Sequence, residues 1–363
     1  MKKILHITPD FNYSCGRSKL VYLYLKHFGN QENYEAYFIA NGGDSLGRLD
    51  EIPKLNFQRL EFSTGNKNLY YIGKFYRNLK NYVVKNKIDL IHTHHRFPEI
   101  ISVLIGKQLK TRTVVSTHGF VKGFKSVSYK SDKIISVSQS ITSYLINKYK
   151  VKSKKIITLL NPAEQFPLRD SEFNNTLRTE LAILPSQKVL LFIGRINEEK
   201  GCNTLLKSFS LLSKIRNDLV LIMSGKIEGS SSYIKSFINN ISVKFVPPSK
   251  NNCDLYSIAD IIILPSRKDS FPFVMIESGT FKKPFIGGNT GGIAEFIEDS
   301  KNGLLVEPDN VQQLTEKIIY LLDNPEIGKT LGNNLHAKVN RLCDFNNYFT
   351  QVENIYDSLI QSK

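Results

Sequence analysis

Short apolar runs alternate with longer amphipathic stretches along most of the chain. In the first half, five runs rich in β-branched and aromatic residues are expected to form strands, at residues 4–7, 37–40, 89–92, 113–116 and 134–137. Five similar runs follow in the second half, at residues 189–193, 220–223, 243–246, 261–264 and 284–286. Strands that alternate with helices are typical of βαβ units and parallel sheets. The pattern therefore predicts an α/β protein with two Rossmann-like domains in tandem.

A polar stretch at residues 162–185 separates the two series of strands and contains three prolines. Proline lacks a backbone N–H and interrupts helices and strands, so such a stretch indicates a domain boundary. A chain of 363 residues is also long for a single core. We therefore predict domains at residues 1–165 and 166–344.

The stretch at residues 67–86 has the spacing of an amphipathic helix. Its apolar face is expected to pack on the core of the first domain through five side chains: Leu69, Ile72, Tyr76, Leu79 and Val83.

The segment FIGRINEEKG, residues 192–201, leads from a predicted strand into a predicted helix. Gly194 and Arg195 end the strand, and Lys200 comes directly before the helix. Two cations five residues apart across such a turn can face one point, where the positive end of the helix adds to their charge. This arrangement predicts a site for an anion such as a diphosphate.

The segment LPSRKDSFPFVMIESG, residues 264–279, carries two carboxylates in a largely apolar context. Asp269 is expected in a strand-to-helix loop and Glu277 on the second turn of the helix. Both would lie near the carboxyl end of a strand, where open α/β sheets bind ligands. Glu277 could accept hydrogen bonds from two ribose hydroxyls, and Asp269 could do the same for a sugar. The glycine-rich stretch at residues 287–292 could present further backbone amides.

Together these motifs resemble the retaining GT-B glycosyltransferases of the glycosyltransferase family 4 kind. The resemblance implies two Rossmann-like domains that face each other across a cleft, with a C-terminal helix at residues 345–360 that packs back on the first domain. It also implies that Arg195 and Lys200 bind the donor's diphosphate and that Glu277 holds the nucleotide ribose. Asp269 stands where the family usually has glutamate, in contact with the donor sugar. The donor site implied in the second domain consists of Gly194, Arg195, Lys200, Asp269, Ser270, Phe271, Pro272, Phe273 and Glu277.

The first half resembles the family more weakly. Gly16 follows the first strand, where the family has a glycine-rich loop near the phosphates. His118 and Gly119 end another predicted strand and match the family's His-Gly, whose histidine lies near the sugar. The resemblance thus adds Gly16 to the donor site and His118 to the catalytic residues, which are His118, Arg195, Lys200 and Asp269.

His92, His94 and His95 form a cluster that could in principle bind a metal. No cysteine or acid joins them at ligand spacing, so we expect no metal there and expect these side chains to line the cleft between the domains. The chain also contains no Asp-X-Asp, the pattern that would hold a metal–diphosphate complex. We therefore predict a metal-independent enzyme with no cofactor besides the nucleotide-sugar substrate.

The formal net charge of +16 is concentrated in the first half. Residues 1–170 contain 28 Lys and Arg against 12 Asp and Glu, whereas residues 171–363 contain 21 of each. A solvated basic face and a surface for anionic lipid both explain this excess. The segment HGFVKGFKSVSYK, residues 118–130, interleaves aromatic and basic residues and is the better candidate for acceptor or membrane contact.

These observations predict a retaining hexosyltransferase that moves a sugar from a nucleotide diphosphate to a glycan or lipid-linked acceptor of the bacterial envelope. Four widely spaced cysteines suit a reducing cytoplasm, and we expect the protein there, attached peripherally to the inner face of the plasma membrane. A nucleotide-sugar epimerase on the same fold is the alternative. A basic nucleic-acid-binding protein is disfavoured by the neutral second half, and a nicotinamide dehydrogenase by the absence of Gly-X-Gly-X-X-Gly after the first strand.

Overall fold

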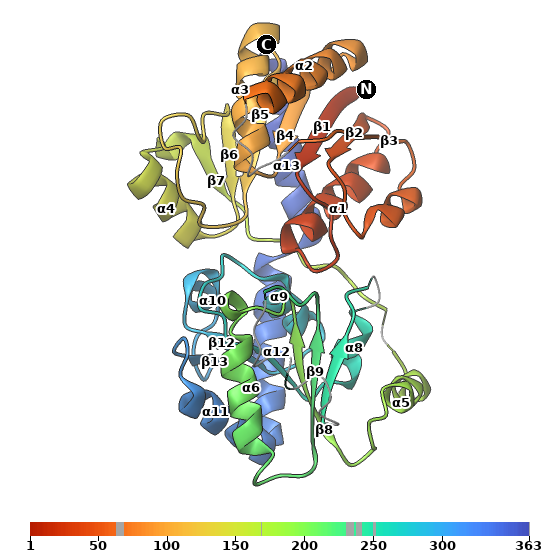
Figure 1. Ribbon diagram of the computed structural model, residues 1–363, viewed down its shortest axis with the longest axis vertical. Helices are drawn as coiled ribbons and strands as arrows, with labels where there is room; N and C mark the ends of the chain where they lie inside the picture. Colours follow the sequence, from red (N-terminus) through yellow and green to blue (C-terminus); the bar gives the residue numbers. More distant parts are fainter. Residues whose placement is uncertain (63–68, 168, 230–235, 237–241, 250–251, 363) are drawn as a thin grey trace. The chain divides into compact units, whose positions relative to one another are not determined.

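The computed structural model describes residues 1–62, 69–167, 169–229, 236, 242–249 and 252–362. The chain forms two compact units (Figure 1). Unit 1 contains residues 1–160 and 346–363, and unit 2 contains residues 161–345.

Unit 1 is built on a parallel sheet of seven strands in the order β3-β2-β1-β4-β5-β6-β7. The strands are β1 Lys2–Thr8, β2 Tyr34–Ala40, β3 Leu55–Arg59, β4 Leu90–Thr93, β5 Arg112–Thr117, β6 Lys133–Ser136 and β7 Ile156–Thr158. The chain moves outward from β1 through β2 to β3 and then returns to add β4 on the other side of β1. The point where the strand order reverses therefore lies between β1 and β4.

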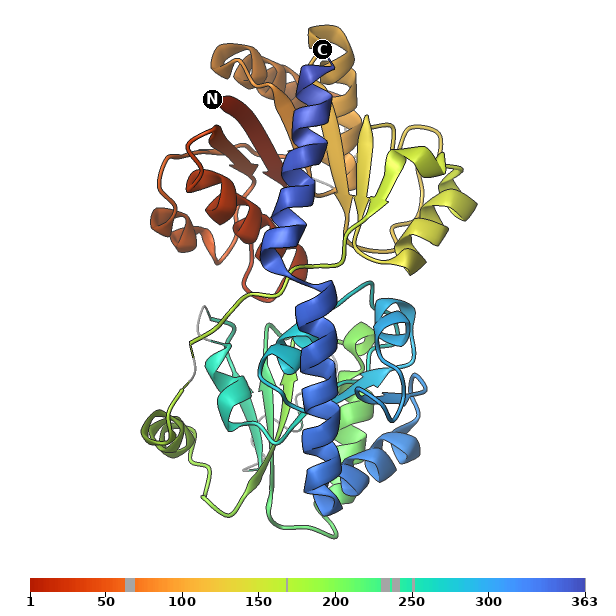
Figure 2. The same cartoon turned by 180° about the vertical axis from the view of Figure 1, so that it is seen from behind.

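The helices of unit 1 cover both faces of this sheet, one with apolar side chains and the other with aromatic rings that contact histidines. They are α1 Gly16–Gly29, α2 Leu69–Asn86, α3 Arg96–Leu109, α4 Gln139–Tyr149 and α13 Phe345–Gln361. On one face, α2 and α3 pack on an apolar cluster that includes Leu5, Ile7 and Ile91. Figure 2 shows α13 along the sheet. On this second face of the sheet, opposite α2 and α3, the helices α1 and α13 contribute aromatic rings that contact His6 and His92. Because side chains alternate between the faces of a strand, Leu5 and His6 point in opposite directions.

Unit 2 contains a parallel sheet of six strands in the order β10-β9-β8-β11-β12-β13. The strands are β8 Lys188–Ile193, β9 Leu219–Ser224, β10 Val243–Val246, β11 Ile261–Leu264, β12 Phe285–Gly288 and β13 Leu304–Val306. The helices are α5 Ser171–Glu180, α6 Cys202–Leu212, α8 Asp254–Ile258, α9 Phe273–Thr280, α10 Gly291–Phe296, α11 Val311–Asp323 and α12 Pro325–Leu342. Here the strand order reverses between β8 and β11.

The sequence prediction of two parallel-sheet α/β domains is confirmed. Each of the ten predicted strands is present, and the structure adds β3, β7 and β13. The predicted helix at residues 67–86 corresponds to α2, which the structure describes from Leu69 onward. Leu79 and Val83 are buried as predicted, but Leu69 is 82% exposed and Phe75 takes a core position instead. The prediction for Leu69 is therefore wrong, because the apolar contacts of α2 begin one turn later.

Candidate functional site

The sheet of unit 2 brings two predicted motifs together at its reversal point. β8 and β11 are adjacent, parallel strands, so their carboxyl ends lie at the same edge of the sheet. The segment from Gly194 to Gly201 follows β8, and the loop that contains Asp269 follows β11. Open α/β sheets bind ligands in the crevice outside the carboxyl ends of their strands at such a point. The fold therefore makes this edge the candidate site of unit 2.

Lys200 and Asp269 form the central ion pair of this site. The Lys200 amine Nζ lies 2.6 Å from Asp269 Oδ2, and the two side chains are only 16% and 8% exposed. The Ser266 hydroxyl also donates to Oδ2 at 3.2 Å, and the Ser270 amide donates to Oδ1 at 3.0 Å. Asp269 thus fixes the position of the Lys200 charge, a contact that neither motif predicts alone.

Glycines allow the loops of the site to approach each other closely. Gly201 has a φ of 76°, and a Cβ atom there would lie 2.0 Å from the Pro265 carbonyl oxygen. A Cβ atom on Gly292 would lie 1.8 Å from the carbonyl oxygen of Ser270. Since any other residue would force the backbones apart, these glycines hold the turn after β8 and the start of α10 against the Asp269 loop.

Arg195 is held by a different carboxylate. Its Nη1 atom lies 3.3 Å from Glu228 Oε2, and both side chains are more than one-third exposed. Asn197 connects the two cation positions, because its amide nitrogen donates to Glu228 at 3.0 Å while its oxygen accepts from the Lys200 amide at 3.1 Å. Exposed ion pairs of this kind contribute little to stability, so Arg195 can exchange Glu228 for an anionic ligand at small cost.

Glu277 lies on the second turn of α9, as the sequence predicts. Its carboxylate accepts a hydrogen bond from the buried Tyr256 hydroxyl. Burial and the charge of Glu277 raise the pKa of Tyr256 well above its usual value, so this hydroxyl stays a donor. The side chains of Phe271 and Phe273 are buried. These two rings therefore shape the loop from within rather than offering an open surface.

In unit 1, the loop after β1 leads into α1, which begins at Gly16. The next residue, Arg17, forms an ion pair with Asp10 at 2.6 Å. The Ser18 hydroxyl accepts from the Asn12 amide at 3.0 Å, which helps to close the loop. Gly16 thus lies at a helix start beside a cation, at the sheet's reversal point.

His118 follows β5 directly, at the same edge of the sheet. Its Nε2 atom lies 3.3 Å from Nδ1 of His94. Burial, and then the charges of Arg17 and His95, lower the pKa of His118 to about 3. His118 is therefore a neutral ring near neutral pH.

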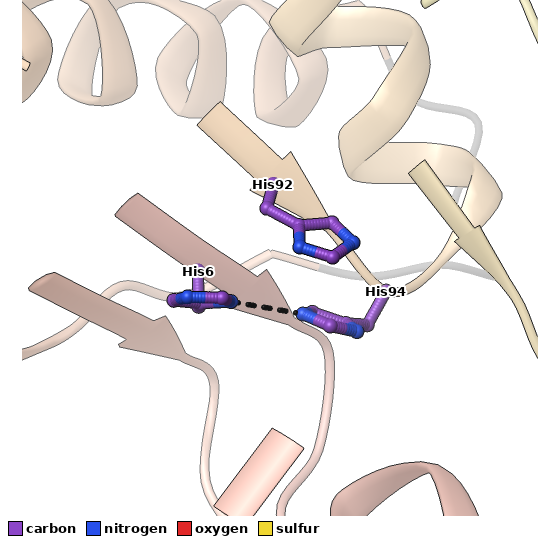
Figure 3. A group of neighbouring side chains, drawn as sticks. All are labelled: His6, His92 and His94. Carbon is purple, nitrogen blue, oxygen red and sulfur yellow. Dashed lines mark hydrogen bonds between the residues drawn. The ribbon is translucent and has the colours of Figure 1, made fainter. Parts of the chain in front are cut away.

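Three buried histidines of unit 1, His6, His92 and His94, lie close together (Figure 3). The nitrogens of His6, His92 and His94 lie within 4.8 Å of one another, close enough to share a metal ion. However, His92 is hydrogen-bonded through both nitrogens, to the Tyr356 hydroxyl and to the Ser116 hydroxyl. A metal would have to displace one of these partners. His92 and His94 are 0% and 1% exposed, so the expectation that they line a cleft is wrong.

Two family models match the chain in succession. The model "Glycosyltransferase Family 4" matches residues 21–164, and the model "Glycosyl transferases group 1" matches residues 173–337. Together the matches cover most of both units. The two parallel-sheet α/β units have the GT-B fold of solved glycosyltransferases. The chain belongs to the GT-B glycosyltransferases of the family 4 kind.

Individual relatives agree with this assignment. The capsular polysaccharide biosynthesis glycosyltransferase CapM of Staphylococcus aureus is 23% identical over 99% of this chain and 98% of its own. A glycosyltransferase structure from Rickettsia africae matches with a TM-score of 0.84 and 23% identity, covering 100% and 99% of the two chains. The Anabaena protein HepE, solved with UDP and glucose, matches with a TM-score of 0.83 and 16% identity over 99% and 100%. At these identities, the two structures establish the fold alone.

Several residues of these sites were not found by sequence reasoning. Glu228 and Tyr256 hold Arg195 and Glu277, but they lie outside any motif and far away in the sequence. His6 joins the histidine cluster because it pairs with His92 across β1 and β4. The sequence shows that His6 lies on an apolar strand. It does not show that this strand pairs with the strand that carries His92.

Proposed function

We propose that this protein is a retaining hexosyltransferase that moves a sugar from a nucleoside-diphosphate donor to a glycan or lipid-linked acceptor of a bacterial envelope. Unit 2 binds the donor and unit 1 binds the acceptor in this proposal. The name of the relative CapM, which refers to capsular polysaccharide biosynthesis, supports the acceptor class. The HepE structure with UDP and glucose supports the donor class.

The observation that carries the proposal is the Lys200–Asp269 pair at the reversal point of unit 2. A cation that is held in place before the reaction stabilises the charge that develops on a departing diphosphate. Arg195 adds a second cation, and α6 begins at Cys202, two residues after Lys200, so that the positive end of its helix dipole adds to these charges. A carboxylate has about four acceptor positions, so Asp269 can keep its present partners and still accept a hydrogen bond from a sugar hydroxyl.

The reaction in this proposal needs no covalent intermediate. The bond between the anomeric carbon and the diphosphate oxygen breaks, and a bond to the acceptor oxygen forms on the same face of the sugar. The proton of the acceptor hydroxyl passes to the departing diphosphate. His118 contacts the transferred sugar in this proposal, Glu277 binds the ribose, and Gly16 lies near the phosphates. Lys200 and Arg195 supply the positive charge, so no metal is required.

Activity measurements test this function directly. The purified protein is incubated with a panel of uridine and guanosine diphosphate sugars, with and without an envelope glycan or a lipid-linked acceptor. We expect free nucleoside diphosphate and a larger glycan only when the acceptor is present. Conversion of the donor to an isomeric nucleotide sugar without acceptor would instead identify an epimerase. Absence of turnover with every donor and acceptor would contradict the proposal.

The loop at residues 120–130 supports contact with an anionic membrane. Its Phe124 and Val127 side chains are 54% and 45% exposed, and Lys122 and Lys125 are exposed beside them. The Arg96 guanidinium holds the loop by donating to the carbonyls of residues 122 and 123, at 2.6 and 2.8 Å. A fixed loop presents these side chains at low entropic cost. Within the described residues, no helix is long and apolar enough to cross a bilayer.

We therefore also propose peripheral attachment to the cytoplasmic face of the plasma membrane. Each lysine near an anionic surface contributes about 1 kcal/mol, so changing Lys122 and Lys125 to Glu should abolish co-sedimentation with anionic vesicles. The control changes Lys107 and Lys110 to Glu, which alters the net charge equally on exposed positions of unit 1. Equal loss in both variants, or equal binding of the wild type to neutral vesicles, would contradict a specific role for the loop.

A further inference from the structure

The buried histidines of unit 1 form a hydrogen-bonded chain that ends at His118. Nδ1 of His6 lies 3.1 Å from Nε2 of His94, as the dashed line in Figure 3 marks. Nδ1 of His94 then lies 3.3 Å from Nε2 of His118. His92 lies beside this chain but bonds to Tyr356 and Ser116 instead. The chain therefore runs from the sheet interior to the proposed catalytic edge.

The sheet and its aromatic cover fix the rings of this chain. The His94 backbone amide donates to the Ile7 carbonyl at 2.9 Å, which ties the end of β4 to β1. The Tyr24 ring of α1 packs against both His6 and His94, with centroid distances of 5.2 and 5.3 Å. His92 stacks on His94 with a centroid distance of 4.3 Å. Packing on several sides leaves the two rings little freedom to rotate.

All three rings of the chain are neutral near neutral pH. Burial lowers the pKa of His6 to about 3 and that of His94 well below its usual value, and the pKa of His118 is about 3. A neutral imidazole has one donor nitrogen and one acceptor nitrogen. The two hydrogen bonds must therefore point in the same direction along the chain, so that only two proton arrangements are possible.

The inner end of the chain favours one of these arrangements. Nε2 of His6 is buried and has no hydrogen-bond partner among the described residues. If each ring donated its N–H toward the sheet interior, Nε2 of His6 would carry a buried N–H with no acceptor, which is rare in folded proteins. If each ring donates its N–H toward His118, Nε2 of His6 carries no proton and leaves only a lone pair unshared. The outward direction puts a proton on Nδ1 of each ring.

We propose that His6 and His94 are positioning residues that hold His118 in the Nδ1–H tautomer, so that His118 meets the sugar as a hydrogen-bond donor and not as a base. The substrate contact in this inference rests on the proposed function, whereas the tautomer does not. A neutral donor suits a ring that lies near the Arg17 cation. It can hold a sugar hydroxyl without adding another positive charge.

Imidazole ¹⁵N spectra of the full chain, labelled at histidine, test the tautomer without any substrate. We expect the proton of His118 on Nδ1 in the wild type. His94→Leu should convert His118 to the other tautomer or to a mixture. His94→Asn should preserve the wild-type pattern, because the asparagine amide nitrogen occupies the position of Nδ1 and can donate to His118.

A matched variant separates this role from general stability. His92→Leu removes an equally buried ring from the same layer but leaves the chain to His118 intact. We expect it to lower the melting temperature as much as His94→Leu while the His118 tautomer stays unchanged. The kcat/KM of sugar transfer should fall on the order of 10- to 100-fold in His94→Leu and recover in His94→Asn.

Three results would overturn the inference. They are a His118 proton on Nε2 in the wild type, an unchanged His118 tautomer in His94→Leu, and ¹⁵N signals of metal-bound rings in the purified protein. Since the spectra need no donor or acceptor, their failure is distinct from failure of the proposed function, which would appear as absent sugar transfer in a protein with the expected tautomer.

Discussion

The two units use the same kind of sheet but arrange opposite chemistry at its reversal point. In unit 1, neutral histidines and tyrosines fill the space over β1 and β4 and are almost fully buried. In unit 2, the corresponding edge carries opposite charges, with Lys200 bound to Asp269 and Arg195 bound to Glu228. A buried neutral network can fix the direction of hydrogen bonds, whereas a charged pair can exchange a partner for an anionic ligand.

Burial explains why each unit uses the chemistry it does. An ionised group deep in a protein loses its hydration at a cost of several kcal/mol. His6 and His92 are 0% exposed, so their layer stays neutral. The unit 2 pairs lie at the sheet edge, and Arg195 and Glu228 are more than one-third exposed. Arg195 and Glu228 therefore keep part of their hydration, whereas the less exposed Lys200 and Asp269 offset the loss of hydration by pairing with each other.

The largest expected effect is an acid sensitivity that is greater in unit 1 than in unit 2. An unfolded histidine binds a proton near pH 6.5, whereas His6 in the folded protein does so only near pH 3. Stability from this group is therefore complete above pH 6.5 and is lost as the pH falls toward 3. The loss is about 1.4 kcal/mol per pH unit from His6 alone, and His92 and His94 change in the same direction.

Region-resolved hydrogen exchange between pH 7 and 4.5, corrected for intrinsic rates, measures this difference. Peptides from β1 and β4 should lose protection before peptides from β8 and β11. Six of the seven histidines lie in the unit 1 sequence, and only His336 lies in unit 2. Earlier loss of protection in unit 2 would contradict the contrast between the units.

The next effect concerns the charged pair of unit 2. Lys200→Ala should lower turnover by about 100-fold, because the loss of one preorganised contact to the departing diphosphate costs roughly 3 kcal/mol. Lys317→Ala is the matched control, since Lys317 is 20% exposed and bound to Asp299 at 2.9 Å in the same unit. Steady-state kinetics distinguish the two variants. Near-normal turnover in Lys200→Ala would remove the basis of the phosphate assignment.

A smaller effect, on ligand binding, should distinguish Glu277 from Asp269 in unit 2. Glu277→Gln should weaken binding of the free nucleoside diphosphate by about tenfold, because hydrogen bonds to a charged group contribute about 1.5–3 kcal/mol. Asp269→Asn keeps the side-chain shape and should mainly weaken binding of the intact sugar donor. Calorimetry with both ligands measures the difference. Equal losses for both ligands in both variants would contradict the separate roles.

The smallest expected effect is that of a chelator. Activity should persist in EDTA, because Lys200, Arg195 and the start of α6 supply the charge that a metal would bring. The measurement compares initial rates with and without EDTA, followed by addition of magnesium or manganese. Loss of activity that either metal restores would contradict a metal-independent site and would reopen the question of His6, His92 and His94 as ligands.

Most strands, and the loops that carry Lys200 and Asp269, could be predicted from the sequence, because apolar runs with glycine and proline at their ends are local signals. The missed strands are short or weakly apolar. Residues 55–59 in β3 are mostly exposed, and β7 has only three residues. The pattern on α2 was correct in period but wrong in its start, because Leu69 has the right spacing without a partner surface.

The partners within each site could not be predicted from one sequence. The Lys200–Asp269 pair joins positions 69 residues apart, and Gly201 and Pro265 make it possible by letting two loops touch. The histidine chain depends on the register that sets His6 beside His92. Such contacts follow from the strand order. β1 lies between β2 and β4, and the hydrogen-bonded histidines gather on the β4 side of His6.

We propose above that the protein transfers a hexosyl group with retention from a nucleoside-diphosphate sugar. Proton NMR during turnover measures this retention, because the coupling constant of the anomeric proton reports the configuration of donor and first product in one sample. We expect an α-linked donor to give an α-linked product while nucleoside diphosphate accumulates. A β-linked first product, or an isomerised donor with no transfer, would contradict it.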